Sequence, residues 1–224
     1  MYKRPHHQRI AAVLDRLNAD LLRDAACYFA GGTAIAMQLD EYRESVNIDF
    51  LCATQDGYRT LRSLVFDRGI KALFKGPVEL LREVRSDQYG IRCFLTESGD
   101  PIKFEIVREA RIDLTGQEVD GIPVTCLSRN DLFAEKLLAN ADRGADKGVL
   151  SRDIIDLTMM ERRWGSIPAA AWDKARSAYG DSVERAWENA RQQLRDDPRH
   201  FASCVERMGI DQVAARELDE ALAA

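Results

Sequence analysis

The 224-residue sequence predicts an α+β protein, with strands and helices in its first half and helices alone thereafter. Up to about residue 125, apolar residues alternate in short segments with the two-residue period of a β-strand, and helical segments lie between them. Beyond that point apolar residues recur every three or four positions, the period of an amphipathic helix. We therefore expect two domains, over residues 1–126 and 127–224.

The first elements follow from apolar spacing and turn residues. Apolar residues at helical spacing predict an amphipathic helix over 5–24, and the apolar run 27–30 predicts the first strand. A helix is expected over 33–39, a strand over 46–52, and a helix over 58–69 after the Asp-Gly pair at 56–57.

The remaining elements of the first half are predicted to be strands. Alternation predicts strands over 79–85, 90–96 and 102–107, with a Ser-Gly-Asp-Pro turn before the last. A strand or hairpin is expected over 118–125. The period then becomes helical, with a helix over 129–141.

The C-terminal region is predicted to be a helical bundle. A helix is expected from residue 151, and three or four more between 168 and 224. Aromatic residues recur there at helical spacing. We interpret these aromatic residues as core rather than as a base-stacking surface.

Composition excludes several classes of protein. Hydrophobic residues make up 46% and charged residues 31%, which argues against extended disorder. No apolar run is long enough to span a bilayer and residues 1–16 lack an apolar signal core, so we expect a cytoplasmic protein with no membrane partner. The five cysteines lack metal-ligand spacing and are expected to be buried, reduced thiols.

Charge is unevenly distributed along the chain. The net charge of −5 argues against general attraction to nucleic acid. Between residues 58 and 92, however, eight basic residues accompany four acidic ones. This surplus indicates either a face that binds phosphates of a nucleotide or RNA, or an ordinary solvated surface.

The stretch around Gly31 and Gly32 has the features of a phosphate site. Adjacent glycines turn tightly and let a ligand approach the backbone, and a helix starting at Thr33 points unsatisfied N–H groups at that space. The alternative is a turn that only reverses the chain. On the next strand Asp49 lies between two apolar residues, so it faces away from the core, where a metal ion could join it to a phosphate.

The order of these residues resembles the polymerase-beta type of nucleotidyltransferase. After 31–33 come a helix, Arg43, Ser45, Asn47 and Asp49, which is similar to the first motif of the AbiEii family, the toxins of type IV toxin–antitoxin pairs. The family has a carboxylate where this chain has Asn47. The resemblance implies a polymerase-beta-like nucleotidyltransferase core with a mixed, mostly antiparallel sheet and flanking helices, plus a C-terminal helical bundle that completes the nucleotide cleft.

Three later segments also resemble family motifs. Lys103 and Glu105 share one face of a strand, which by itself is typical of an exposed ion pair, and they match the family's Lys-x-Asp/Glu motif. Lys136, whose position alone indicates a surface lysine lying along apolar residues, matches a Ser-then-Lys-x-x-Ala motif. Arg152 and Asp153 match a fourth motif, although the family's full spacing before the aspartate is missing.

The resemblance implies roles for these residues. Lys136 and Arg152 would offset the charge of the triphosphate, and Asp153 would act catalytically or contact the base. The expected catalytic residues are Asp49, Glu105, Lys136 and Asp153. The expected nucleotide-binding residues are Gly31, Gly32, Thr33, Ser45, Lys103 and Arg152, and the expected metal ligands are Asn47, Asp49 and Glu105.

The implied activity is Mg²⁺-dependent transfer of a nucleotidyl group from an NTP to an acceptor hydroxyl, with one or two metal ions. Family members imply tRNA or another RNA as acceptor, a toxin role and a cognate antitoxin partner. Asn47 leaves three interpretations open: activity with Asp49 and Glu105 alone, an inactive relative that still binds nucleotide, RNA or a partner protein, or an engineered change that traps a toxic enzyme. An amide contributes no negative charge to a metal site.

Overall fold

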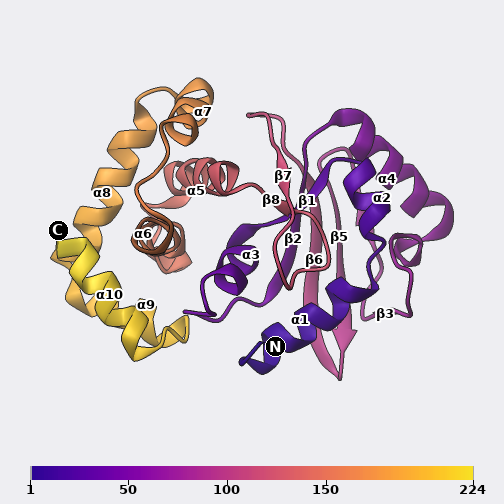
Figure 1. Cartoon of the computed structure of the whole chain (residues 1–224), viewed down its shortest axis with the longest axis horizontal. Coiled ribbons are helices and arrows are strands. Elements are labelled where there is room, and N and C mark those ends of the chain that lie inside the picture. The colour runs from indigo at the N-terminus through magenta and orange to yellow at the C-terminus, as the bar shows by residue number, and fades with distance from the viewer. Residues whose placement is uncertain (1, 224) are drawn as a thin grey trace. The chain divides into compact units, whose positions relative to one another are not determined.

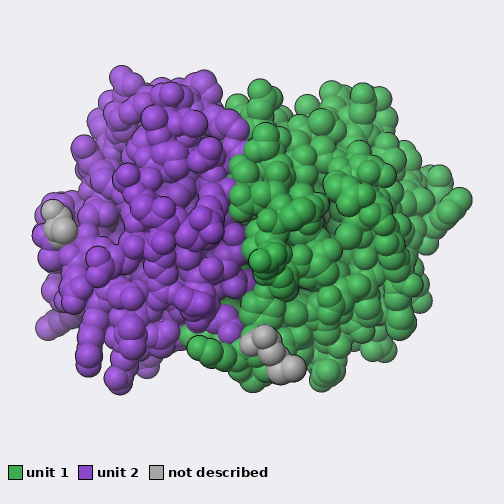
Figure 2. Space-filling model, in the orientation of Figure 1, with its two compact units in different colours: residues 1–34, 45–128 green, residues 35–44, 129–224 purple. Residues whose placement is uncertain are grey.

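The computed structural model describes residues 2–223, which form two compact units (Figure 2). The first unit comprises the residues up to 34 together with 45–128, and the second comprises 35–44 together with the residues from 129 onward. The boundary between the units after residue 128 lies two residues beyond the predicted domain boundary. Residues 35–44, which the sequence prediction assigns to the first domain, pack with the second unit.

The first unit is built on one mixed sheet (Figure 1). Its strand order is β3-β5-β6-β2-β1-β8-β7, and β4 pairs with β5. Most neighbouring strands are antiparallel, whereas β2 pairs in parallel with β6 and β1 with β8, which confirms the predicted mixed, mostly antiparallel sheet. The strands are β1 Cys27–Ala30, β2 Asn47–Cys52, β3 Glu79–Leu80, β4 Arg85–Ser86, β5 Gly90–Glu97, β6 Asp100–Arg108, β7 Gly116–Gln117 and β8 Cys126–Leu127.

The apolar face of this sheet forms a core with an aromatic centre. Phe29, Phe50 and Phe104, on adjacent strands, are fully buried, with neighbouring ring centroids 5.6 and 5.9 Å apart. Helices α2 (Ala19–Asp24) and α4 (Gln55–Arg68) lie on the same side of the sheet as each other (Figure 1). The opposite face, which carries Asp49 and Glu105, is only half-buried, because successive side chains of a strand alternate between faces.

The helices of the first unit differ from the prediction in several places. The prediction of a single helix over 5–24 is wrong, because two helices form there. Leu17 is extended and bridges Phe74, and the Asn18 side chain accepts a hydrogen bond from Leu21 N at 3.4 Å, which starts a second helix. The Asp-Gly pair at 56–57 lies inside the first turn of a helix rather than before its start. The helices are α1 Pro5–Arg16, α2 Ala19–Asp24, α3 Gly31–Gln38, α4 Gln55–Arg68 and the 3-10 turn Ile70–Leu73.

One strand prediction is wrong, and another holds only in its hairpin form. The strand expected over 79–85 is two short strands, β3 and β4, both paired with β5. Of the strand or hairpin expected over 118–125, the structure has the hairpin: the segment connects the antiparallel strands β7 and β8 and is not itself a strand. In both places the sequence carries strand-forming residues, but hydrogen bonding to a neighbour decides which of them form a ladder.

The second unit is helical, as predicted. Its helices are α5 Arg129–Arg143, α6 Arg152–Trp164, α7 Ala169–Tyr179, α8 Ser182–Asp196, α9 Pro198–Arg207 and α10 Gln212–Ala223, with a 3-10 turn over Lys147–Val149. Helix α3 begins in the first unit and ends in the second. Within residues 2–223, none of the helices combines the length and apolarity that crossing a membrane requires. All five cysteines are buried and none is in a disulfide, as predicted.

Candidate functional site

The Gly-Gly turn lies directly against the carboxylate of Asp49. Gly31 has φ +74°, a conformation that glycine adopts without strain, and a Cβ added there would lie 2.9 Å from Asp49 Oδ2. Helix α3 begins at Gly31, two residues earlier than expected, so Gly31 and Gly32 are both in its first turn. The glycine therefore lets the start of the helix and the carboxylate approach each other.

Asp49 and Glu105 lie side by side on neighbouring strands. Parallel pairing of β2 and β6 puts Asp49 opposite Glu105 and Asn47 opposite Lys103. Neighbouring strands are about 4.8 Å apart, and paired residues point to the same face. The structure thus brings the two predicted carboxylates, the amide and the lysine together on one face of the first unit.

Glu105 is held by two cations. Its Oε2 accepts a hydrogen bond from Lys103 Nζ at 2.5 Å and its Oε1 accepts one from Arg92 Nε at 2.5 Å. Burial alone would raise the pKa of Glu105, but these hydrogen bonds and the two positive charges lower it. Glu105 is therefore ionised at neutral pH. Arg92 is part of the basic stretch between residues 58 and 92, but its own role was missed, because its register with Glu105 is set by strand pairing.

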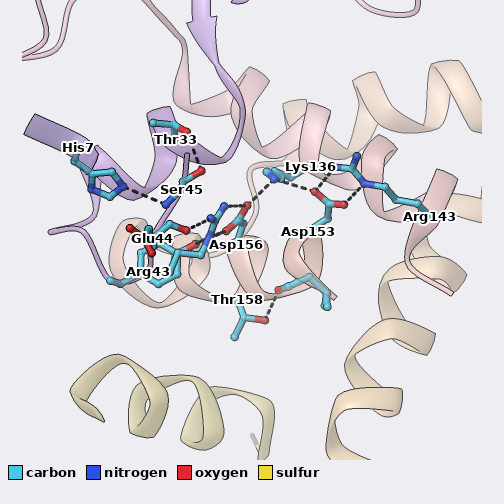
Figure 3. A network of polar contacts seen from close by, with 12 residues as sticks. His7, Thr33, Arg43, Glu44, Ser45, Lys136, Arg143, Asp153, Asp156 and Thr158 are labelled. Carbon is cyan, nitrogen blue, oxygen red and sulfur yellow. Dashed lines mark hydrogen bonds and ion pairs between the residues drawn. The ribbon is translucent and has the colours of Figure 1, made fainter. Parts of the chain in front are cut away.

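Thr33 is buried and connects two parts of the site. Its Oγ1 donates a hydrogen bond to the Asn47 carbonyl at 2.6 Å and lies 2.8 Å from Ser45 Oγ (Figure 3). Ser45 N donates to His7 Nε2 at 3.2 Å, and His6 Nε2 donates to the Val46 carbonyl at 3.0 Å. The segment before β2 is thus fixed by α3 and α1. The contribution of the N-terminal histidines was missed, because nothing in their spacing relates them to residue 45.

The donor set of the first unit fits Mg²⁺ that arrives with a nucleotide. Mg²⁺ prefers hard oxygen ligands and is commonly held by one or two carboxylates together with substrate phosphates. Asp49 and Glu105 supply two such carboxylates, and Asn47 offers an amide oxygen on the same face. Among residues 2–223, no cluster of three or more Asp, Glu, His or Cys side chains could hold a metal ion. The fit therefore depends on phosphate oxygens as further ligands.

A buried ionic cluster occupies the second unit. Lys136 Nζ, on α5, lies 2.8 Å from Asp153 Oδ1 and 2.5 Å from Asp156 Oδ2 on α6 (Figure 3). Arg143 donates to both oxygens of Asp153, at 2.6 and 2.9 Å. The Lys136 side chain is 8% exposed, in contrast to the surface lysine that its position in the sequence indicates.

Arg43 completes this cluster. Its Nε and Nη2 donate to the two oxygens of Asp156 at 2.7 and 2.9 Å, and the Tyr42 hydroxyl also donates to Asp156 (Figure 3). Tyr42, Arg43 and Asp156 are all buried. Asp156 thus joins the segment 35–44 to α5 and α6. Tyr42 and Arg143 carry no motif that sequence reasoning could have found.

The carboxylates of the cluster remain ionised. Burial would raise the pKa of Asp153, but the charges and hydrogen bonds of Lys136 and Arg143 hold it far below its ordinary value. Burial acts the same way on Asp156, and Arg43 and Lys136 again outweigh it. Asp153 therefore has no tendency to accept a proton near neutral pH.

Arg152 differs in its surroundings from the neighbouring Asp153. It is the first residue of α6 and its side chain is exposed, whereas Asp153 is buried in the cluster. The arginine that bonds Asp153 is Arg143, on α5.

Comparison of the chain with known proteins identifies one family. A family model described as "Nucleotidyl transferase AbiEii toxin, Type IV TA system" matches residues 12–224. No curated protein matches the chain. A crystal structure of a Helicobacter pylori protein, provisionally described as a nucleotidyltransferase, has a similar fold, with a TM-score of 0.55 and 13% identity over 97% of this chain and 92% of that one.

Two further crystal structures show lower similarity. JHP933 from Helicobacter pylori has a TM-score of 0.40 and 13% identity, covering 88% of this chain and 97% of its own. An antigenic nucleotidyltransferase-like protein from Paracoccidioides brasiliensis has a TM-score of 0.46 and 15% identity, covering 86% of this chain and 92% of its own.

Proposed function

Because the chain belongs to the AbiEii family of nucleotidyl transferase toxins, we propose that it transfers a nucleotidyl group from an NTP to an acceptor hydroxyl. The observation that carries this proposal is the register of β2 and β6, which pairs Asp49 with Glu105, together with the close approach of Gly31 to Asp49. Asp49 lies against the start of α3, whose N–H groups suit a phosphate, and Glu105 is its neighbour on the next strand, which supports the proposal.

The residues of the first unit have separate tasks in this proposal. The first turn of α3, from Gly31, binds phosphate oxygens through its backbone N–H groups. Asp49 and Glu105 would hold Mg²⁺, with Asn47 as a neutral third ligand, and the ion would neutralise phosphate charge. Lys103 binds a phosphate as a point charge, and Thr33 keeps Ser45 and the start of β2 in place.

In the second unit, we propose that Lys136 offsets phosphate charge, as the family's motif implies, and that Asp153 supports it. Lys136 has three N–H donors, and the carboxylates of Asp153 and Asp156 engage the ammonium group and so orient it. Because both carboxylates are held ionised, Asp153 acts by orienting Lys136 and Arg143 rather than as a proton acceptor. Arg152 is assigned to the charge of the incoming nucleotide or RNA, since its side chain is exposed.

We further assign an RNA acceptor, such as tRNA, and a cognate antitoxin as partner, since the family's members are toxins of type IV systems. Incubation of the protein with each labelled NTP, Mg²⁺ and total tRNA tests the activity. The proposal predicts label on RNA from the wild-type protein and none from an Asp49→Ala variant. RNA labelled equally by both proteins would contradict it.

A second candidate follows from Asn47. An amide in place of a carboxylate removes one negative charge beside Asp49, which weakens a site for divalent ions. In this alternative the protein binds nucleotide or RNA without turning it over. The Asn47→Asp variant separates the two: a large gain in labelling by this variant over an inactive wild type favours the second candidate, and labelling by the wild type excludes it.

A further inference from the structure

We propose that Arg92 is the counter-ion of Glu105 in the absence of substrate, and that the metal ion enters the site together with the triphosphate rather than before it. This inference rests on the proposed function. It goes further by assigning a role to a residue outside the family motifs and an order to the binding of metal and nucleotide.

The contacts of Glu105 carry the first step. Each of its oxygens accepts a hydrogen bond at 2.5 Å, one from Arg92 and one from Lys103, and the carboxylate is only 15% exposed. A carboxylate can hold a metal ion only through these same oxygens. Each oxygen keeps a second lone pair, but a cation bound there would lie beside the positive charge of Lys103 or Arg92, and this repulsion favours displacement of one of the two basic side chains.

The charges on this face carry the second step. Asp49 lies opposite Glu105 on β6, and Glu105 lies opposite Arg92 on β5. The two negative charges of Asp49 and Glu105 are balanced by the two positive charges of Lys103 and Arg92, and the more exposed Asp87 carboxylate lies 3.6 Å from Arg92 Nη1 outside this group. A neutral site has little affinity for a bare divalent ion, whereas triphosphate oxygens bring both further metal ligands and partners for the displaced cations.

The backbone beneath Arg92 is shaped for its guanidinium. A Cβ added at Gly90 would lie 2.8 Å from Arg92 Nη2 and 2.9 Å from its Cζ. Gly90 therefore leaves the room in which the Arg92 side chain lies while it bonds Glu105. An alanine at position 90 has to push the guanidinium away, and it does so without changing a charge.

These steps give the order of events. Without substrate, Arg92 and Lys103 satisfy Glu105. With a triphosphate and its metal ion present, Arg92 would bind a phosphate oxygen, for which its side chain, 36% exposed, has access, and Glu105 would be available to hold the metal ion. Arg92 is thus a positioning residue for Glu105 and a phosphate ligand afterwards.

Binding of Mn²⁺ alone, followed by electron paramagnetic resonance, tests the first half of the proposal. Because Arg92→Gln removes one charge next to the site, we expect it to tighten Mn²⁺ binding about tenfold. Gly90→Ala should also tighten Mn²⁺ binding, because it pushes the guanidinium of Arg92 away from Glu105. Arg92→Lys, which keeps the charge, should bind Mn²⁺ within about threefold of the wild type.

Binding of inorganic tripolyphosphate in saturating Mg²⁺, followed by calorimetry, tests the second half. Here Arg92→Gln should weaken binding about tenfold, because a charge-assisted contact is lost. Arg85→Gln is the matched control: Arg85 is exposed on β4, one strand further from Glu105, and its removal should change either affinity less than twofold.

The outcomes separate this inference from the proposed function. If Asp49→Ala abolishes Mn²⁺ binding while Arg92→Gln leaves it unchanged or weakens it, the inference fails and the proposed function stands. If neither variant alters Mn²⁺ binding, the inference and the proposed function both fail. They also both fail if the wild type and the two variants bind neither Mn²⁺ nor the tripolyphosphate. Opposite effects of Arg92→Gln on metal and on tripolyphosphate support the inference, and a merely structural role of Arg92 would not produce them.

Discussion

Arg43 and Asp156 form a buried bidentate ion pair, with N–H···O distances of 2.7 and 2.9 Å, between residues 113 positions apart in the chain. Asp156 also accepts hydrogen bonds from Tyr42 and Lys136. Removing two charges from water costs several kcal/mol, so such a pair contributes more to a unique arrangement than to stability. Here it fixes the segment 35–44 within the second unit.

Asp156→Ala should destabilise the second unit by about 3–5 kcal/mol, because it leaves Arg43 and Lys136 buried without their counter-ion. Urea unfolding followed by tryptophan fluorescence measures this selectively, since Trp164, Trp172 and Trp187 all belong to the second unit. An Asp173→Ala control on the exposed face of α7 should change stability by less than about 0.5 kcal/mol. An Asp156→Ala protein as stable as the control would show that the pair is not required.

Gly31→Ala should reduce tripolyphosphate affinity more than the same change at another glycine with positive φ. At Gly31 the new Cβ meets both the left-handed backbone, φ +74°, and Asp49 Oδ2 at 2.9 Å. Gly69 has φ +73° but no heavy atom within 4 Å of an added Cβ, so Gly69→Ala reports the backbone contribution alone, about 1 kcal/mol. We expect Gly31→Ala to lose at least tenfold in tripolyphosphate affinity, and Gly69→Ala to retain it. Equal affinities of the two variants would contradict the close packing of Gly31 on Asp49.

The buried carboxylates predict a loss of stability in acid. Asp153 and Asp156 have pKa values below their ordinary value of 3.8, so their stabilisation is complete above that value and is lost as the pH falls through the folded-state pKa. The wild-type second unit should therefore lose stability below about pH 4. An Asp153→Asn, Asp156→Asn double variant should be less stable at pH 7 and vary less with pH below 4. Parallel pH profiles for the variant and the wild type would argue against ionised carboxylates in the cluster.

Much of the first unit could be predicted from local sequence. The two-residue alternation around Asp49 and around Glu105 predicted both strands and the shared face of Lys103 and Glu105. What alternation does not contain is which strands are neighbours. The parallel pairing that sets Asp49 beside Glu105, and the antiparallel pairing that adds Arg92, are tertiary contacts, which explains why Arg92 was missed.

The second unit shows the same limit in another form. Helical spacing predicted α5 but assigned Lys136 to its solvent-facing edge, because the counter-ions lie 17 and 20 residues further on. The break after Leu17 escaped prediction for a similar reason. The apolar pattern continues through it, and only the bridge to Phe74 and the cap by Asn18 interrupt the helix.

The most direct test of the central claim is the rate of nucleotidyl transfer after isosteric removal of each paired carboxylate charge. With labelled NTP, Mg²⁺ and tRNA, Asp49→Asn and Glu105→Gln should each lower kcat at least about a hundredfold, because the proposed function assigns charge neutralisation to a metal ion held by these two carboxylates. Asp67→Asn, an exposed position on α4, should stay within twofold of the wild type. If all three variants transfer the nucleotide at the wild-type rate, the Asp49–Glu105 pair is not the catalytic centre.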